Sequence, residues 1–166
     1  GRWQAGAMSE QGHTYRAEVT WAGTTAVGYD AYDRNHLVRT PGVGAGLHLS
    51  GDAAFRGDPT RWNPEQLLVA AASSCQLLSF LAVCARARID VVAYEDAAEG
   101  VMPTDDPPLR LTRIELRPAI TLADTDRPRP PVERLAHLTE VAHRECFIAN
   151  SLRSEVAVSP TFTWRG

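Results

Sequence analysis

The sequence predicts an α+β domain, and three observations lead to this fold class. A long apolar run follows a helix start signal at Asn63–Pro64, segments with period-two alternation lie on both sides of that run, and a second amphipathic helix pattern begins at Pro130. With 166 residues, 44% hydrophobic content and a net charge of −3, the chain can bury a core of its own. We expect one domain over residues 8–166, preceded by a leader at residues 1–7 that does not belong to the natural protein.

The part of the chain before the long helix predicts a β-meander. Residues Thr14–Trp21 alternate between apolar and polar, which is typical of a half-buried strand. Enrichment in β-branched and aromatic residues predicts two further strands, at Val27–Tyr32 and His36–Arg39, and the glycine-rich stretch that follows can hold a short strand at Leu47–Leu49 that is not counted in the predicted order. The glycine-rich stretch at 41–62 is long enough to serve a function or to contact a partner subunit.

The apolar run predicts one long buried helix. Asn63 can cap its first turn, Pro64 suits the first helical position, and Glu65 favours the positive end of the helix dipole. From Leu67 to Ala85 apolar residues cover all sides, so we expect the helix to be surrounded by protein. Its length approaches that of a membrane span, but three Ser and one Gln within the run and the lack of a topogenic charge asymmetry favour a core helix.

Two long strands, a helix and a final strand are predicted after the central helix. Residues Asp90–Met102 and Leu109–Leu122 form an antiparallel pair in this prediction, with Pro118 at an edge or a bulge. The second helix opens at Pro130–Pro131 and runs toward Cys146. Residues Glu155–Trp164 close the chain as a strand, which gives the order β-β-β-α-β-β-α-β.

Composition excludes several classes of function. All 17 cationic residues are Arg, and a chain without Lys has neither a Schiff-base lysine nor a P-loop lysine. The mild acidity and the lack of a basic stripe argue against a nucleic-acid partner. Three cysteines are too few for a secreted disulfide scaffold, and we expect a cytoplasmic protein.

The spacing along the predicted helix keeps Cys75 and Cys84 apart. Nine residues along a helix place Cys84 roughly 180° round from Cys75 and about 13 Å away, so these two cannot form a disulfide within an intact helix. Cys146, after the second helix, is under no such restriction. Both Cys75 and Cys146 can also be inert core thiols, and spacing alone does not decide between these interpretations. A metal site at His143 and Cys146 is disfavoured because no second ligand pair has matching spacing.

The residues around the two cysteines resemble the OsmC/Ohr family of organic hydroperoxide peroxidases. The resemblance is carried by Asn63-Pro64-Glu65-Gln66 running to Ser73-Ser74-Cys75, and by Ala142-His143-Arg144-Glu145-Cys146 about seventy residues later. It implies an OsmC-like fold, in which antiparallel sheets surround two long central helices in an intertwined homodimer.

The resemblance also implies residue roles. Cys75 is then the peroxidatic cysteine, Cys146 the resolving cysteine, and Glu65 the carboxylate that holds an activating arginine. The family's peroxide-resistance branch has that arginine just after the first strand, where this chain has Gly23-Thr24-Thr25. Arg34 is the substitute that we expect, with Arg39 as the next candidate and Arg56 and Arg61 after it.

The implied function is a thiol-dependent peroxidase that reduces organic hydroperoxides, and hydrogen peroxide less well. It would proceed through a sulfenate on Cys75 and an intramolecular disulfide, and a dithiol such as a lipoylated protein would reopen the disulfide. This chemistry requires no bound cofactor, no metal, no nucleic acid and no membrane. The alternative is a non-catalytic OsmC-like protein that binds a small apolar ligand at the dimer interface, an interpretation favoured by the missing early arginine.

Overall fold

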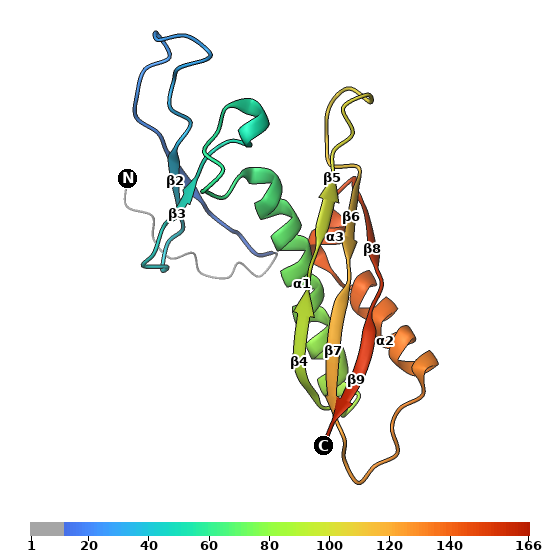
Figure 1. Ribbon diagram of the computed structural model, residues 1–166. Coiled ribbons are helices and arrows are strands. Elements are labelled where there is room, and N and C mark those ends of the chain that lie inside the picture. Colours follow the sequence, from blue (N-terminus) through green and yellow to red (C-terminus); the bar gives the residue numbers. More distant parts are fainter. Residues whose placement is uncertain (1–11) are drawn as a thin grey trace. The chain divides into compact units, whose positions relative to one another are not determined.

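The computed structural model describes residues 12–166, which form two compact units, one ending at Pro64 and one beginning at Glu65 (Figure 1). The leader expected at residues 1–7 and the start at Met8 lie outside the described residues. The first unit contains a small sheet and a short 3-10 helix. The second contains the long helix, two further sheets and two more helices.

The sheet of the first unit is antiparallel, in the order β1-β2-β3, and its strands are Glu18–Thr20, His36–Arg39 and Leu47–Leu49. The predicted strands at His36–Arg39 and Leu47–Leu49 are confirmed. The first strand is shorter than expected, and the prediction that it is half-buried is wrong. All three of its residues are exposed to solvent among the residues that the structure describes.

The strand predicted at Val27–Tyr32 is wrong, because this segment forms turns. Gly28 has φ +91°, a left-handed conformation that favours glycine, and its N–H donates to the carbonyl of Thr25 at 3.0 Å. Its own carbonyl accepts from the N–H groups of Ala31 and Tyr32 at 3.1 and 3.2 Å. These local hydrogen bonds take the place of a sheet ladder and bring Tyr29 and Tyr32 close to each other, with ring centroids 6.2 Å apart.

The rest of the first unit leads to the long helix. Leu49 bridges to Trp62 in parallel, and the N–H of Ser50 donates to the Trp62 carbonyl at 2.8 Å. The 3-10 helix η1 covers Ala53–Phe55, where the side chain of Asp52 accepts from the N–H of Ala54. In the part of this unit that the structure describes, only Leu49 and Ser50 are fully buried.

The long helix α1, Pro64–Arg86, confirms the predicted central helix. Its buried residues follow helical spacing along one side, namely Ala72, Gln76, Phe80, Val83 and Cys84. A second stripe at the same spacing is exposed, namely Ser74, Leu78, Leu81 and Ala85. By length and composition α1 could cross a membrane, yet its buried stripe belongs to the packed core of the second unit.

The second unit has two three-stranded sheets that lie end to end, and their strands alternate along the chain (Figure 1). One has the order β4-β7-β9, with strands Val91–Asp96, Pro118–Ala123 and Thr161–Arg165. The other has the order β5-β6-β8, with strands Glu99–Val101, Arg113–Leu116 and Glu155–Val158. The antiparallel pairing expected between the first two long segments is confirmed, but β8 and β9 join in parallel, so both sheets are mixed.

Each predicted long strand is divided in two. Pro118 lies at the junction between β6 and β7, where the chain leaves one sheet and enters the next, and it is the first residue of β7. Proline is tolerated at the first residue of a strand, which explains how it can begin a strand that lies in the middle of its sheet. Ser159–Pro160 makes the corresponding break between β8 and β9.

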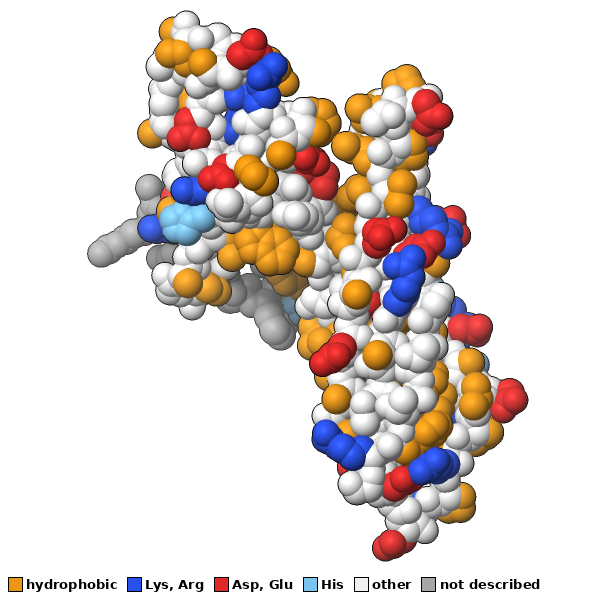
Figure 2. Space-filling model, in the orientation of Figure 1, with side chains coloured by type: hydrophobic (Ala, Val, Ile, Leu, Met, Phe, Trp, Pro, Cys, Tyr) orange, Lys and Arg blue, Asp and Glu red, His pale blue; other side chains and the backbone are white. Residues whose placement is uncertain are grey.

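The core of the second unit lies between its helices and one face of its sheets. Phe80 of α1, Ile120 and Leu122 of β7 and Leu135 of α2, Val132–Arg144, form one cluster. Because Ile120 and Leu122 point to the same side of β7, α1 and α2 cover the same face of that sheet. The other face of β6 carries an ion-pair network of Arg113, Glu115, Arg117 and Glu155. Figure 2 shows basic and acidic side chains side by side over this region, as expected for a face in contact with water.

A short third helix, α3, Phe147–Ser151, was not predicted. Cys146 stands between α2 and α3, in an extended conformation. The fold is an α+β fold, as expected, and its architecture brings the end of α2 and the start of α3 to the middle of α1.

Candidate active site

The structure brings the Cys75 and Cys146 thiols together. Cys75 lies in the middle of α1, next to its buried stripe, and is half-buried. Cys146 is fully buried, and its side chain shares a hydrogen bond with that of Cys75. Two thiols in direct contact, from elements about seventy residues apart, can form a disulfide after oxidation without a large rearrangement.

The surroundings of Cys146 act on its thiol in opposite directions. Burial raises the pKa of Cys146, and the neighbouring Cys75 thiol raises it further. The backbone N–H groups of Ala149 and Ile148 lower the pKa, and the N–H of Ala149 lies 3.5 Å from the sulfur, which caps α3. The sulfur therefore has hydrogen-bond donors for a thiolate inside an otherwise apolar environment.

Sequence reasoning missed the polar side chains Ser73 and Gln76, which stand two residues before and one residue after Cys75 on α1, and Asp96 of β4, which Ser73 contacts. The hydroxyl of Ser73 donates to Oδ2 of Asp96 at 2.5 Å, and the backbone N–H of Arg117 donates to Oδ1 of Asp96 at 2.7 Å. Gln76, which follows Cys75, is 1% exposed, and its Nε2 lies 3.5 Å from the carbonyl of Thr139 on α2. Alternation in β4 is the one sequence signal for Asp96, since it points to the same side of the strand as Tyr94.

Three buried polar atoms of the second unit have no hydrogen-bond partner within residues 12–166. They are Oε1 of Gln76, the hydroxyl of Tyr94 and Nδ1 of His143. Buried polar atoms without a partner are rare in folded proteins, and an ordered water or another molecule can complete their hydrogen bonding.

Cys84 has the environment of an inert thiol. It is fully buried in the core with Phe80 and Leu122, and burial raises its pKa to about 11. Because α1 is continuous from Pro64 to Arg86, the helical spacing keeps Cys84 on the side opposite Cys75.

Arg34 is held in a fixed position in the first unit. Its two terminal nitrogens donate to the carbonyls of Tyr32 and Tyr29 at 2.6 and 2.5 Å. Its guanidinium also stacks on the two rings, with Cζ 3.8 Å from the centroid of Tyr32 and 5.0 Å from that of Tyr29. The turn around Tyr29 and Tyr32, which the sequence did not predict, therefore orients Arg34.

Arg34 lines a cavity of about 560 Å³ in the first unit. Its walls are largely aromatic, from Trp21, Tyr29, Tyr32 and Phe55. Arg34 and Asp33 bring one charge of each sign to the lining, and His36 and Ser50 are also polar. A cavity of this volume with several aromatic walls fits a small apolar molecule that carries a polar group.

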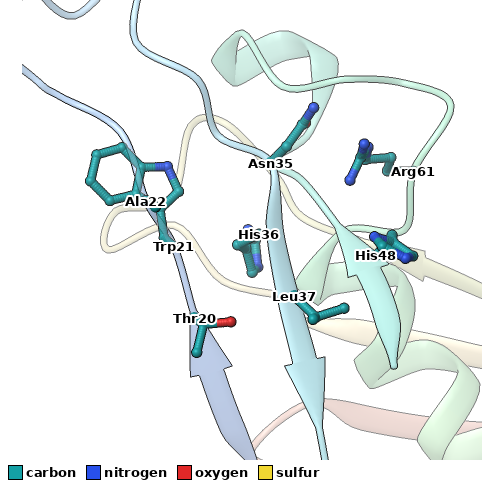
Figure 3. A pocket seen from close by; sticks show the side chains of 8 residues that line it. All are labelled: Thr20, Trp21, Ala22, Asn35, His36, Leu37, His48 and Arg61. Atoms are coloured by element: carbon teal, nitrogen blue, oxygen red, sulfur yellow. The ribbon is translucent and has the colours of Figure 1, made fainter. Parts of the chain in front are cut away.

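A second cavity of about 310 Å³ lies in the same unit (Figure 3). Figure 3 shows Trp21 on one side and Arg61 and His48 on the other. Arg61 already pairs with Asp58 at 3.5 Å, and no cysteine is among the eight residues that line the cavity. This cavity therefore lacks the group on which the expected chemistry depends.

The other expected site residues are placed as follows. Glu65 is half-buried in the first turn of α1, about 15 Å along the helix from Cys75. Arg39 is exposed at the end of β2, and Arg56 pairs with Asp30 at 2.9 Å. Arg34 and Arg39 belong to the first unit, whereas Cys75, Cys146 and Glu65 belong to the second. Across the described chain, no group of three or more His, Cys, Asp or Glu side chains could hold a metal ion.

These features define an α+β protein with two neighbouring thiols, one in the middle of a long core helix and the other just before α3. The family model for OsmC-like proteins matches residues 57–161, and the chain belongs to the OsmC-like family. The match covers both thiols, Glu65, and most of the second unit.

Solved structures show the same fold. An OsmC-like protein of unknown function from Vibrio cholerae is 28% identical, with a TM-score of 0.80 over 90% of this chain and 99% of that one. An organic hydroperoxide resistance protein from Elizabethkingia anophelis, with thiocyanate bound, is 21% identical, with a TM-score of 0.68 over 95% and 100% of the two chains. An organic hydroperoxide resistance protein from Legionella pneumophila is 18% identical, with a TM-score of 0.62 over 91% and 97%. No curated protein matches the sequence.

Proposed function

We propose that this protein is a thiol-dependent peroxidase that reduces organic hydroperoxides, and hydrogen peroxide less well. The observation that carries the proposal is the contact between the Cys75 and Cys146 thiols. An inert pair of core thiols has no need of a half-buried position for one sulfur and backbone donors for the other. Membership in a family that includes organic hydroperoxide resistance proteins supports the same function.

In the first step, the Cys75 thiolate attacks one oxygen of the peroxide. The sulfur–oxygen bond forms as the O–O bond breaks, and the alkoxide leaves and takes up a proton to become an alcohol. The peroxide is reduced by two electrons, and Cys75 becomes a sulfenic acid. The half-buried position of Cys75 leaves a path for a peroxide, which the fully buried Cys84 lacks.

In the second step, Cys146 condenses with the sulfenic acid. A disulfide forms between Cys146 and Cys75, and the hydroxyl group leaves as water. An external dithiol, such as a lipoylated protein, then reopens the disulfide by thiol–disulfide exchange. The cycle requires no bound cofactor.

A cation must favour the Cys75 thiolate, because the helix does not. Cys75 lies about 17 Å from the start of α1, and the partial charge of a helix end acts over one turn. We propose Arg34 as this cation, with Glu65 orienting it. The resemblance to the OsmC/Ohr family, which uses an arginine held by a glutamate for this purpose, supports the role.

We propose that the working form is a homodimer in the cytoplasm, with neither nucleic acid nor membrane as a partner. The exposed stripe of α1 supports this assembly, since Leu78 is 65% exposed within an otherwise apolar helix. Phe147, directly after Cys146, is exposed as well. A second copy that covers this stripe would bury an interface of the obligate class, above about 2,000 Å². Light scattering should then show a dimer at all measurable concentrations, and a stable folded monomer would contradict it.

Oxidation followed by peptide mapping tests the mechanism. The reduced protein is treated with one equivalent of an alkyl hydroperoxide, and consumption of peroxide is followed in the presence of a dithiol. We expect a Cys75–Cys146 disulfide, an unmodified Cys84, and loss of peroxide consumption in Cys75→Ser but not in the control Cys84→Ala. A protein that consumes no peroxide, or that links Cys75 to Cys84, would exclude the two-cysteine peroxidase.

The second candidate function is the binding of a small apolar ligand without catalysis. The aromatic cavity of about 560 Å³ around Arg34 favours this alternative, because it can accept a ligand without any use of the thiols. Binding of an apolar carboxylate that is lost in Arg34→Ala, together with no peroxide consumption, would support this function over the peroxidase.

A further inference from the structure

The carboxylate of Asp96 joins three segments of the second unit. Asp96 is the last residue of β4, and its Oδ2 accepts a hydrogen bond from the hydroxyl of Ser73 on α1 at 2.5 Å. Its Oδ1 accepts from the backbone N–H of Arg117 at 2.7 Å, and Arg117 stands between β6 and β7, where the chain passes from one sheet to the next. Through Asp96 the long helix is therefore tied by hydrogen bonds to the passage between the two sheets.

The apolar character of α1 makes such a bond important for its position. Apolar contacts have no preferred direction, so they hold a helix that is apolar on nearly all sides less narrowly than polar contacts do. A hydrogen bond, in contrast, constrains both a distance and an angle. Between Leu67 and Ala85, the side chains of Ser73 and Gln76 are the two that donate to other elements within the described chain, and the Gln76 bond is the longer, at 3.5 Å.

Ser73 lies close to Cys75 along the helix. Two residues correspond to about 3 Å along the axis of α1, so a shift of Ser73 moves Cys75 by nearly the same amount. The bond between Ser73 and Asp96 therefore sets where the Cys75 sulfur stands relative to the sheets.

Cys146 is positioned on the same part of the sheets. It caps α3, and Ile148 of that helix packs against the buried cluster of Ala72, Ile114 and Leu116. Ile114 and Leu116 belong to β6, which ends directly before Arg117. The two thiols are thus carried by segments that are both anchored at β6 and the residue that follows it, one through Asp96 and the other through Ile148.

We propose that Asp96 and Ser73 are positioning residues, which hold the Cys75 sulfur where a disulfide with Cys146 can close. This inference rests on the proposed function, because the disulfide is the second step of that function. A disulfide tolerates only a narrow range of geometry, with its two Cβ atoms roughly 3.5–4.5 Å apart. A misplacement of about 1 Å at a reacting group is enough to slow a reaction by about a hundredfold.

The equilibrium between the protein disulfide and dithiothreitol tests the proposal without any peroxide. In this reaction the protein disulfide takes up two electrons and two protons and opens to two thiols, while dithiothreitol gives them up and closes to a cyclic disulfide. We expect Ser73→Ala, which places a good helix former in α1, to move the equilibrium at least tenfold toward the reduced protein. An equilibrium that stays at the wild-type value in Ser73→Ala would overturn the proposal.

Ser79→Ala is the matched control. Ser79 is a half-buried serine of the same helix, and its hydroxyl bonds to no other element within residues 12–166, so its loss should leave the equilibrium unchanged. The readout also separates positioning from a general loss of stability. A substitution that only weakens the fold lowers the free energy of unfolding of the reduced and the oxidised protein alike, and the difference between the two folded states stays the same.

A double substitution tests whether Asp96 acts through Ser73. We expect Asp96→Ala to shift the equilibrium in the same direction, and Ser73→Ala/Asp96→Ala to shift it no further than Asp96→Ala alone, since both changes remove the same bond. Asp96→Asn should recover part of the loss, because an amide can accept from the Arg117 N–H and donate to the Ser73 hydroxyl oxygen. Shifts that multiply in the double variant would mean that the two residues act separately, and the proposal would then be wrong.

The wild type distinguishes a failure of this inference from a failure of the proposed function. If it consumes no peroxide but closes the Cys75–Cys146 disulfide with oxidised dithiothreitol, the peroxidase fails and the equilibrium still decides the positioning role. If it forms no such disulfide with either oxidant, the positioning role fails as well.

Discussion

The two units of this protein differ in how they use apolar side chains. In the first unit Val19, Trp21, Tyr29 and Phe55 are exposed or line a cavity. In the second unit side chains of the same kind fill two clusters between helices and sheets, and many of them are completely buried. The second unit can therefore supply most of the folding free energy, and the first holds the aromatic cavity with Arg34.

This difference suggests a division between stability and reactivity. Segments with few buried contacts open at low free energy, and sites that must admit or release a ligand are drawn from such segments. The thiols lie in the unit with the larger buried core, where a constant spacing between two sulfurs would serve disulfide formation. The cavity lies in the unit with few buried side chains.

The largest effect is expected from a pair of substitutions that compares the units. Phe80→Ala removes a core ring that is 1% exposed, and it should lower the free energy of unfolding by about 3–5 kcal/mol. Val19→Ala shortens a side chain that is 64% exposed, and it should change that free energy by less than about 0.5 kcal/mol. Urea denaturation of both variants at one protein concentration measures the difference.

Equal losses in the two variants would break the comparison. In that case the sheet of the first unit is covered in solution, and the second copy of the proposed dimer is the surface that covers it. A loss that decreases as protein concentration rises would identify the dimer as the cause, since assembly stabilises the folded chain by mass action.

The elements of the second unit were predictable because burial on one side leaves a period in the sequence. The pattern at Leu135, Leu138 and Ala142 specified α2, although Val132 of the same pattern is exposed, and the apolar run with its start signal specified α1. The first unit carries a weaker signal because β1 is exposed and β2 and β3 are only partly buried. The β-branched and aromatic content of Val27–Tyr32 was taken for a strand, whereas Gly28 and local hydrogen bonds make it a turn.

The pH dependence of stability distinguishes Cys84 from the reactive thiols. Burial raises the pKa of Cys84 to about 11, so the folded state keeps this proton at pH values where the unfolded chain, with a pKa of about 8.5, has lost it. The contribution to stability is complete below about pH 8.5 and is lost as the pH rises toward 11, at up to about 1.4 kcal/mol per pH unit.

Cys84→Ala should remove this dependence. We expect the free energy of unfolding to fall less steeply between pH 8.5 and pH 10.5 in the variant than in the wild type, by the titration of one thiol. Denaturation in urea at three pH values in this range, with both proteins kept reduced, gives the two slopes. Identical slopes would mean that Cys84 titrates as an ordinary thiol and is not part of the core.

Within the candidate site, the sequence identified both cysteines but not the side chains around them. Cys75 and Cys146 were found because a motif surrounds each of them. Tyr94 and Asp96 stand in an ordinary strand, and only the packing of β4 beside α1 gives them a place near the thiols. Such a contact depends on how a strand and a helix pack against each other, and the residue pattern of one segment does not reveal it.

The smallest effect concerns an arginine of the first unit that we propose to act on a thiol of the second. Arg34→Ala removes the proposed charge that favours the Cys75 thiolate, so the second-order rate with an alkyl hydroperoxide at neutral pH should fall at least tenfold, about 1.4 kcal/mol of barrier. Arg127→Ala is the matched control, because Arg127 is exposed and is not one of the candidate arginines, so it should leave the rate unchanged. Arg39→Ala tests the next candidate. Glu65→Ala should act in the same direction but more weakly, since it orients the arginine without touching the sulfur. If Arg39→Ala lowers the rate and Arg34→Ala does not, the assignment moves to Arg39. If neither substitution has an effect, no arginine of β2 or of the turn before it activates the thiol, and the cavity around Arg34 is then better explained as a ligand-binding site.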